Sequence, residues 1–167
     1  MKYFIVLLGI SLFLQSCTYA ISPAYLEKSD KAFSFEKLQD EPASAQGKLL
    51  ILGGTIVQTS ILKEGTLLEV TQKALDYWGK PIRTNRTGGI FFILHPGFLN
   101  TMLAVPGVDI TVAGEVLGNG SSVLDNIQYN HSVLLSKELK LWEQERPSWN
   151  QPRWFDPLND PRNPATW

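Results

Sequence analysis

The stretch "KLLILGGTIVQTSI" (Lys48–Ile61) carries the clearest indication of how this chain folds. It is rich in leucine, isoleucine and valine, and β-branched residues are typical of strands. The pair Gly53-Gly54 interrupts its middle. Glycine inside a strand pattern indicates a bulge or a sharp bend, which a barrel needs where a strand turns a corner. We therefore expect one long, bent strand of a β-barrel here.

Four later segments also show strand patterns, at short spacing and with few helical periods between them. They are "TLLEVTQKAL" (Thr66–Leu75), "GGIFFILHPGF" (Gly88–Phe98), "VDITVAGEVLG" (Val108–Gly118) and "IQYNHSVLLSKELKLW" (Ile127–Trp142). In the segment Val108–Gly118, apolar and other residues alternate, which places every second residue from Val108 to Val116 on one face. The last is either one long strand or two strands broken near Ser136.

A short helix is expected before these strands. Ser34 is a suitable N-cap and Glu36 suits the first turn, while Phe35 and Leu38 are spaced to face a core. The whole pattern predicts a mainly β fold, a small OB-like barrel of five to six strands with a short N-terminal helix. A two-sheet sandwich is the alternative.

The N-terminus, "MKYFIVLLGISLFLQS" (Met1–Ser16), has the layout of a secretory signal peptide. Lys2 supplies a positive charge, and Tyr3–Leu14 supply an apolar run of about a dozen residues, too short to span a bilayer as a helix. A buried N-terminal helix or strand is the alternative. The signal peptide is expected to be removed from the mature protein.

Cys17 is the only cysteine of the chain, so it cannot form an internal disulfide. A metal site needs several ligands and a nucleophilic cysteine needs a base in a formed pocket, and neither accompanies it in the sequence. The run Leu14-Gln15-Ser16-Cys17 resembles the lipobox of bacterial lipoproteins. That resemblance implies acyl chains, palmitate among them, on Cys17. Thr18 in place of aspartate then implies sorting to the outer membrane, facing the periplasm.

Composition argues against several classes of function. The 167 residues carry a formal net charge of -1, so no strong field steers the protein toward nucleic acid. Lys80, Arg83 and Arg86 form the only local basic cluster, which is either a solvated loop or a contact with anionic lipid headgroups near the anchor.

No catalytic constellation is evident. The two histidines, His95 and His131, lie at a strand end and within an alternating strand, and no Gly-x-Ser-x-Gly elbow accompanies them. We therefore expect no enzymatic activity, no cofactor and no metal.

After Glu145 the composition changes to "RPSWNQPRWFDPLNDPRNPATW". Half of the ten prolines fall here, which excludes a helix and a central strand. Trp149, Trp154 and Trp167 stand between the prolines. The tail is either an extended strap over the barrel, a disordered tail, or a segment that docks a partner protein or the membrane interface, since tryptophan favours such contacts.

Residues from about Phe33 to Trp142 resemble the Slp family of outer-membrane lipoproteins, of the starvation-inducible type. The resemblance rests on "GGTIV" (Gly53–Val57), "LLEVTQKALDYWGKPI" (Leu67–Ile82), "GGIFFILHPGFL" (Gly88–Leu99), "VDITVAGEVLG" and the closing "KLW" (Lys140–Trp142). It implies an outer-membrane lipoprotein of a Gram-negative bacterium, linked to stress or stationary-phase physiology, without established enzymatic chemistry.

These observations predict four parts: a signal peptide (1–16), a lipidated N-terminus and tether (17–32), a barrel domain (33–145) and a Pro/Trp-rich tail (146–167). The expected function is non-enzymatic, with an envelope structural or stress-related role. One alternative is a periplasmic binding module for an oligosaccharide or peptide, which would need a groove with exposed aromatic residues. The other is an envelope hydrolase, which would need a histidine beside a carboxylate and a hydroxyl.

Overall fold

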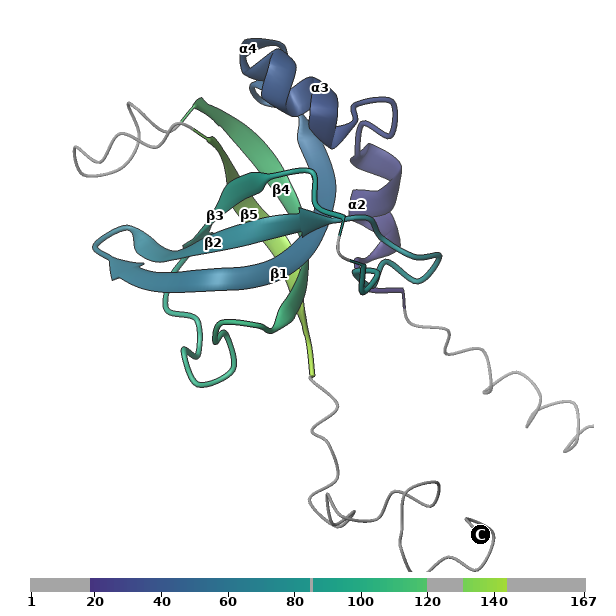
Figure 1. The fold of residues 1–167 in the computed structure, drawn as a ribbon. Helices are drawn as coiled ribbons and strands as arrows, with labels where there is room; N and C mark the ends of the chain where they lie inside the picture. Colours follow the sequence, from purple (N-terminus) through teal and green to yellow (C-terminus); the bar gives the residue numbers. More distant parts are fainter. Residues whose placement is uncertain (1–18, 85, 120–130, 144–167) are drawn as a thin grey trace, which may run out of the picture.

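The computed structural model describes residues 19–84, 86–119 and 131–143 (Figure 1). Five strands form one closed barrel in the order β1-β2-β3-β5-β4. They are β1 (Leu49–Leu62), β2 (Gly65–Lys73), β3 (Ile90–Pro96), β4 (Asp109–Asn119) and β5 (Ser132–Trp142). The prediction of a mainly β, OB-like barrel is confirmed, and the sandwich is not what forms.

Strand β1 bends at the predicted place and takes part in two halves of the barrel. Its first residues pair with β4, and its last residues pair with β2, both antiparallel. The residues Gly53–Thr55 pair on both edges at once: Gly53 lies opposite Lys73 on β2 and Thr111 on β4. A register shift follows directly, between Ile56 and Gln58. The glycine pair thus marks the corner of the barrel, because both neighbours approach the backbone there.

Strand β5 closes the barrel. It pairs antiparallel with β4 and, over three residue pairs, parallel with β3. Of the two alternatives for the segment Ile127–Trp142, the described residues from 131 onward contain one continuous strand. Near Ser136 the strand shows only a register irregularity, because Gly114 pairs with Ser136 while Ala113 pairs with Glu138. The beginning of that segment, residues 127–130, lies outside the described residues.

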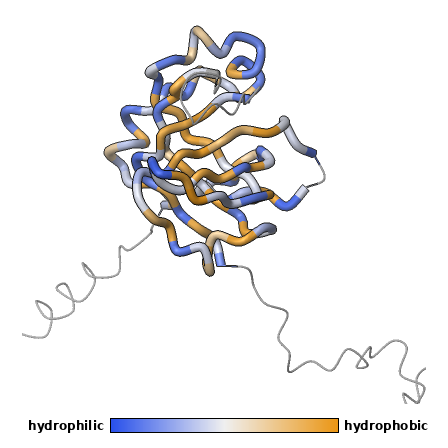
Figure 2. Tube along the Cα trace, turned by 90° about the vertical axis from the view of Figure 1, so that its left-hand side faces the viewer, coloured by the Kyte–Doolittle hydropathy of each residue, from blue (hydrophilic) through white to orange (hydrophobic). Residues whose placement is uncertain are grey.

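Apolar side chains fill the barrel, and in Figure 2 the hydrophobic colour follows the strands. The core holds the expected residues Val108, directly before β4, and Ile110, Val112 and Val116 of β4, together with residues from all the other strands. The helix α3 (Phe35–Asp40) covers one end of the barrel. As predicted, its N-cap Ser34 Oγ accepts a hydrogen bond from Lys37 N, and both Phe35 and Leu38 are buried. The Phe35 ring meets Phe91 edge-on at 5.8 Å.

The described part of the expected tether is packed against the barrel. It contains the helix α2 (Pro23–Lys28), and a further short helix, α4 (Pro42–Ala45), precedes β1. Asp30 N donates to Leu49 O, and Lys48 Nζ donates to Asp30 Oδ2 at 2.7 Å. This hydrogen bond from the Lys48 ammonium group lowers the pKa of the Asp30 carboxyl below its ordinary value. The sequence did not indicate this packing because its apolar residues are too few to form a period.

The corner of β1 can be tested by adding one methyl group at each glycine. At Gly54 an added Cβ would collide with the backbone carbonyl oxygen of Thr71 on the paired strand. At Gly53 the nearest obstacle is the flexible end of the Leu75 side chain. We expect Gly54→Ala to lower the free energy of unfolding by about 1–3 kcal/mol, as overpacking does, and Gly53→Ala to cost less. Urea unfolding midpoints measure the difference, and equal costs would contradict the proposed corner geometry.

Candidate functional site

The connection between β2 and β3 holds a tight turn built around Asp76. Asp76 Oδ1 accepts hydrogen bonds from Trp78 N at 2.9 Å and from Lys80 N at 2.8 Å. The Asp76 backbone N–H donates to Lys80 O, and Gly79 N donates to Asp76 O. Gly79 adopts a φ of 81°, a left-handed conformation that glycine takes without strain. An aspartate that caps its own turn in this way fixes the backbone locally.

The turn is also fastened to the barrel wall through a buried hydroxyl. Thr111 Oγ1, on β4, donates to Gly79 O at 2.6 Å. The same oxygen accepts a hydrogen bond from Trp142 Nε1 at 2.9 Å, from the end of β5. One fully buried threonine therefore joins the turn to two strands.

The beginning of the described chain packs against this turn. Ala20 N donates to Trp78 O at 3.1 Å, and Ile21 is fully buried. Ala20 and Ile21 form a small apolar cluster with Ala113, against which Tyr19, Tyr25, Ile51 and Trp142 pack. Ser22 donates from its backbone N and from its hydroxyl to the Glu138 carboxylate, the latter at 2.7 Å. The chain from Tyr19 onward is therefore held at a defined place beside Trp78.

The turn presents a surface that is both aromatic and positively charged. Tyr77 is 82% exposed and Trp78 48% exposed, and their rings meet edge-on at 5.1 Å. Ile82 is exposed as well. The cations are Lys80, Arg83 and Arg86. We call residues 76–84 together with Arg86 the aromatic–basic loop.

Two of these cations are tied to neighbouring groups. Lys80 Nζ lies 5.6 Å from the centre of the Trp142 ring, a cation–π distance. Arg83 Nε lies 3.8 Å from Asp109 Oδ2, and Arg83 is still largely exposed. Asp109 itself is buried; it accepts a hydrogen bond from Thr55 Oγ1 at 2.7 Å and lies 3.8 Å from Lys73 Nζ. This buried carboxylate is compensated by its neighbours, which explains how it is tolerated at the start of β4.

The structure does not describe the residues that the sequence predicts to carry the function. Cys17, Trp149, Trp154 and Trp167 are outside the described residues. The sequence had indicated Lys80, Arg83 and Arg86 as a basic cluster, either in a solvated loop or in contact with anionic lipid headgroups. It missed Tyr77 and Trp78, although two adjacent aromatic residues in an otherwise polar connection are an available signal.

The histidines do not assemble a hydrolase site among the described residues. His95 Nδ1 lies 3.4 Å from Ser136 Oγ, and the His131 ring lies 6.2 Å from the Phe92 ring. Within residues 19–84, 86–119 and 131–143, neither histidine has a carboxylate within hydrogen-bond or ion-pair distance. The same residues contain no group of three His, Cys, Asp or Glu side chains placed to hold a metal ion.

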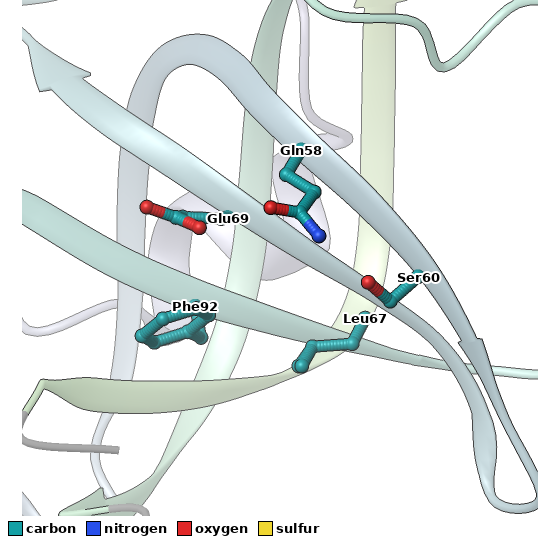
Figure 3. A pocket seen from close by; sticks show the side chains of 5 residues that line it. All are labelled: Gln58, Ser60, Leu67, Glu69 and Phe92. Atoms are coloured by element: carbon teal, nitrogen blue, oxygen red, sulfur yellow. The ribbon is translucent and has the colours of Figure 1, made fainter.

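A shallow pocket lies over strands β1, β2 and β3 (Figure 3). Its lining residues are Gln58, Ser60, Leu67, Glu69 and Phe92. Leu67 and Phe92 alternate with core residues along their strands, so they belong to the outer face of the barrel. The pocket measures about 150 Å³, whereas pockets for small molecules usually measure about 300–1,000 Å³. This pocket offers little room for an oligosaccharide or a peptide, but an open hollow of about 540 Å³ between β1 and the loop after β3, lined by Ile61 and Val105 among others, falls within that range.

The role of Thr111 in fixing the aromatic–basic loop can be tested with Thr111→Val. Valine keeps the shape but leaves the Gly79 carbonyl and the Trp142 indole N–H without their shared partner. We expect the free energy of unfolding to fall by about 1–3 kcal/mol, the cost of unpaired buried polar groups. Amide hydrogens of residues 78–80 should also exchange faster. Thr87→Val, at an exposed position, is the matched control; equal effects of the two variants would refute the proposed role.

Comparison with known proteins places the chain in a family. Among the residues that the structure describes, no helix is both long and apolar enough to cross a bilayer. No curated protein and no solved structure matches the chain. One family model matches residues 14–166, nearly the whole sequence, and it describes the outer membrane lipoprotein Slp family. The chain therefore belongs to the Slp family of outer membrane lipoproteins.

Proposed function

We propose that this protein is anchored to the periplasmic face of the outer membrane by acyl chains on Cys17, and that it has a non-enzymatic, structural or stress-related role in the envelope. The observation that carries the anchor is the extent of the family match. The match begins at residue 14, three residues before Cys17, and so includes the lipobox-like run. The described fold begins at Tyr19, two residues after Cys17.

Acyl chains on one cysteine are sufficient to hold such a domain. Each buried CH₂ group contributes about 0.8 kcal/mol, and stable anchoring takes more than one chain. A diacylglycerol on the Cys17 sulfur and a further chain on its amino group meet that requirement. The new amino group is available only if residues 1–16 are removed, so cleavage of the signal peptide and anchoring are linked in this proposal.

The filled barrel supports a structural role over ligand capture. Side chains from all five strands occupy the interior, and Phe35 and Leu38 of α3 cover one end. A binding module of this shape would need an open groove with exposed aromatic residues. The exposed aromatic pair, Tyr77 and Trp78, instead lies on the β2–β3 connection beside the N-terminal segment.

The anchor can be tested by intact-mass analysis of protein extracted from membranes. We expect a mature chain that begins at Cys17 and carries the mass of the added acyl chains. Cys17→Ser should retain the signal peptide and lose the added mass. An unmodified Cys17 in membrane-extracted protein would contradict the proposal.

The Pro/Trp-rich tail is proposed as a partner-docking segment, since Trp149, Trp154 and Trp167 could anchor an interface. A chain that ends at Glu145 should unfold at the same temperature as the full chain, because the described barrel closes at Trp142. In envelopes, chemical cross-links of the full chain to a partner should be absent from the shortened chain. A large fall in the unfolding temperature would instead favour a strap that covers the barrel.

A further inference from the structure

The covalent path from Cys17 to the aromatic–basic loop is short. Only Thr18 lies between Cys17 and Tyr19, which makes two steps along the chain. An extended chain spans at most about 3.6 Å per step, so the Cα atoms of Cys17 and Tyr19 lie within about 7 Å of each other. Ala20, the next residue, is hydrogen-bonded to the carbonyl oxygen of Trp78. Any group attached to Cys17 is therefore confined to the neighbourhood of this loop. Figure 1 shows the purple start of the described chain beside the connection between β2 and β3.

The exposed side chains of the loop have the chemistry of a membrane–water interface. Tyrosine and tryptophan combine an apolar body with a polar tip, and they gather at the level of the lipid headgroups. Lysine and arginine near the surface are attracted to anionic headgroups. Here Tyr77 and Trp78 belong to the same loop as Lys80, Arg83 and Arg86. The one acidic group of the loop is Asp76. One of its carboxylate oxygens accepts hydrogen bonds from backbone N–H groups of the turn.

The loop is also ordered before it meets any surface. The backbone from Asp76 to Lys80 is fixed by the Asp76 turn and by the Thr111 hydrogen bond to Gly79 O. Binding by a preorganised loop avoids the entropy cost of ordering it. Tyr77 and Trp78 are held outward by this frame, although burial of large aromatic groups is the usual outcome.

We propose that the aromatic–basic loop rests in the headgroup region of the bilayer that holds the acyl chains of Cys17. The domain then stands on the membrane at two adjacent points, in one orientation, with the loop against anionic lipid. This inference rests on the proposed lipid anchor. The anchor supplies most of the affinity, and the loop determines which side of the barrel faces the membrane.

A second exposed apolar surface provides a matched comparison. It lies on residues 97–107, between β3 and β4, where Phe98 and Met102 are 83% and 84% exposed. No charged residue occurs between Pro96 and Val108. This loop follows the opposite end of β3 and lies at the lower left in Figure 1, away from the start of the described chain. Our proposal places it away from the bilayer.

The test uses the mature, acylated protein reconstituted in vesicles of phosphatidylethanolamine and phosphatidylglycerol. In that protein the Cys17 sulfur is blocked by its thioether bond, so Tyr77→Cys and Met102→Cys each carry one free thiol for an environment-sensitive fluorophore. The two positions are almost equally exposed. We expect a blue shift and strong quenching by spin-labelled lipid at position 77, and emission typical of water at position 102. Aqueous emission at position 77, or equal quenching at both positions, overturns the proposal.

The charge contribution is tested with Lys80→Gln and Arg86→Gln together, which leaves the ion pair between Arg83 and Asp109 intact. At about fivefold per basic residue, the ratio of docked to undocked loop should fall roughly twenty-five-fold on anionic vesicles. Lys63→Gln with Lys137→Gln is the control, since it removes the same charge from elsewhere on the barrel. Equal effects of the two pairs refute a specific contact.

Failure of the anchor would look different from failure of this inference. A chain without acyl groups lacks their mass and gives two reactive thiols in each cysteine variant. An acylated protein whose position 77 remains in water overturns the orientation alone. Circular dichroism of each labelled variant checks that the barrel is folded.

Discussion

The structure depends on the place where β1 is paired along both edges. At Gly53–Thr55 the strand is opposite β2 on one side and β4 on the other, and the barrel closes because three strands approach each other there. A side chain at Gly54 would occupy the position of a carbonyl group on β2. Without this close approach, the two halves of β1 would belong to two separate sheets.

Closure of the barrel then determines the surface that surrounds the N-terminal segment. Thr111 of β4 lies opposite Gly53 of β1 and opposite Lys140 of β5. Its hydroxyl group donates a hydrogen bond that holds the turn at Gly79. Ala20 and Ile21 pack onto the neighbouring strand surface. The corner, the turn and the start of the described chain are therefore one connected unit. A change in the pairing of β1 would alter the position of the aromatic–basic loop.

An acyl anchor and a loop contact differ in what they contribute. Acyl chains provide affinity in proportion to the CH₂ groups they bury, and they do not specify how the attached domain is turned. A rigid loop with tyrosine, tryptophan and basic residues adds little affinity, but it favours one orientation because only one side of the domain carries that chemistry. In this protein the acyl anchor would hold the barrel near the membrane. The loop contact would orient the barrel so that its remaining surface faces the periplasm.

The sequence alone determined the strands, the capped helix at Ser34 and the bend at Gly53-Gly54, because these follow from alternation, capping and glycine content along short stretches. It also indicated Cys17 through a motif of adjacent residues. It did not reveal the packing of Ile21, the burial of Asp109 or the exposure of Tyr77 and Trp78. These depend on contacts between residues far apart in the chain, such as Ala20 with Trp78 and Thr111 with Gly79. Only the closed barrel brings those residues together, so only the tertiary structure decided which side chains are buried and which face the surroundings.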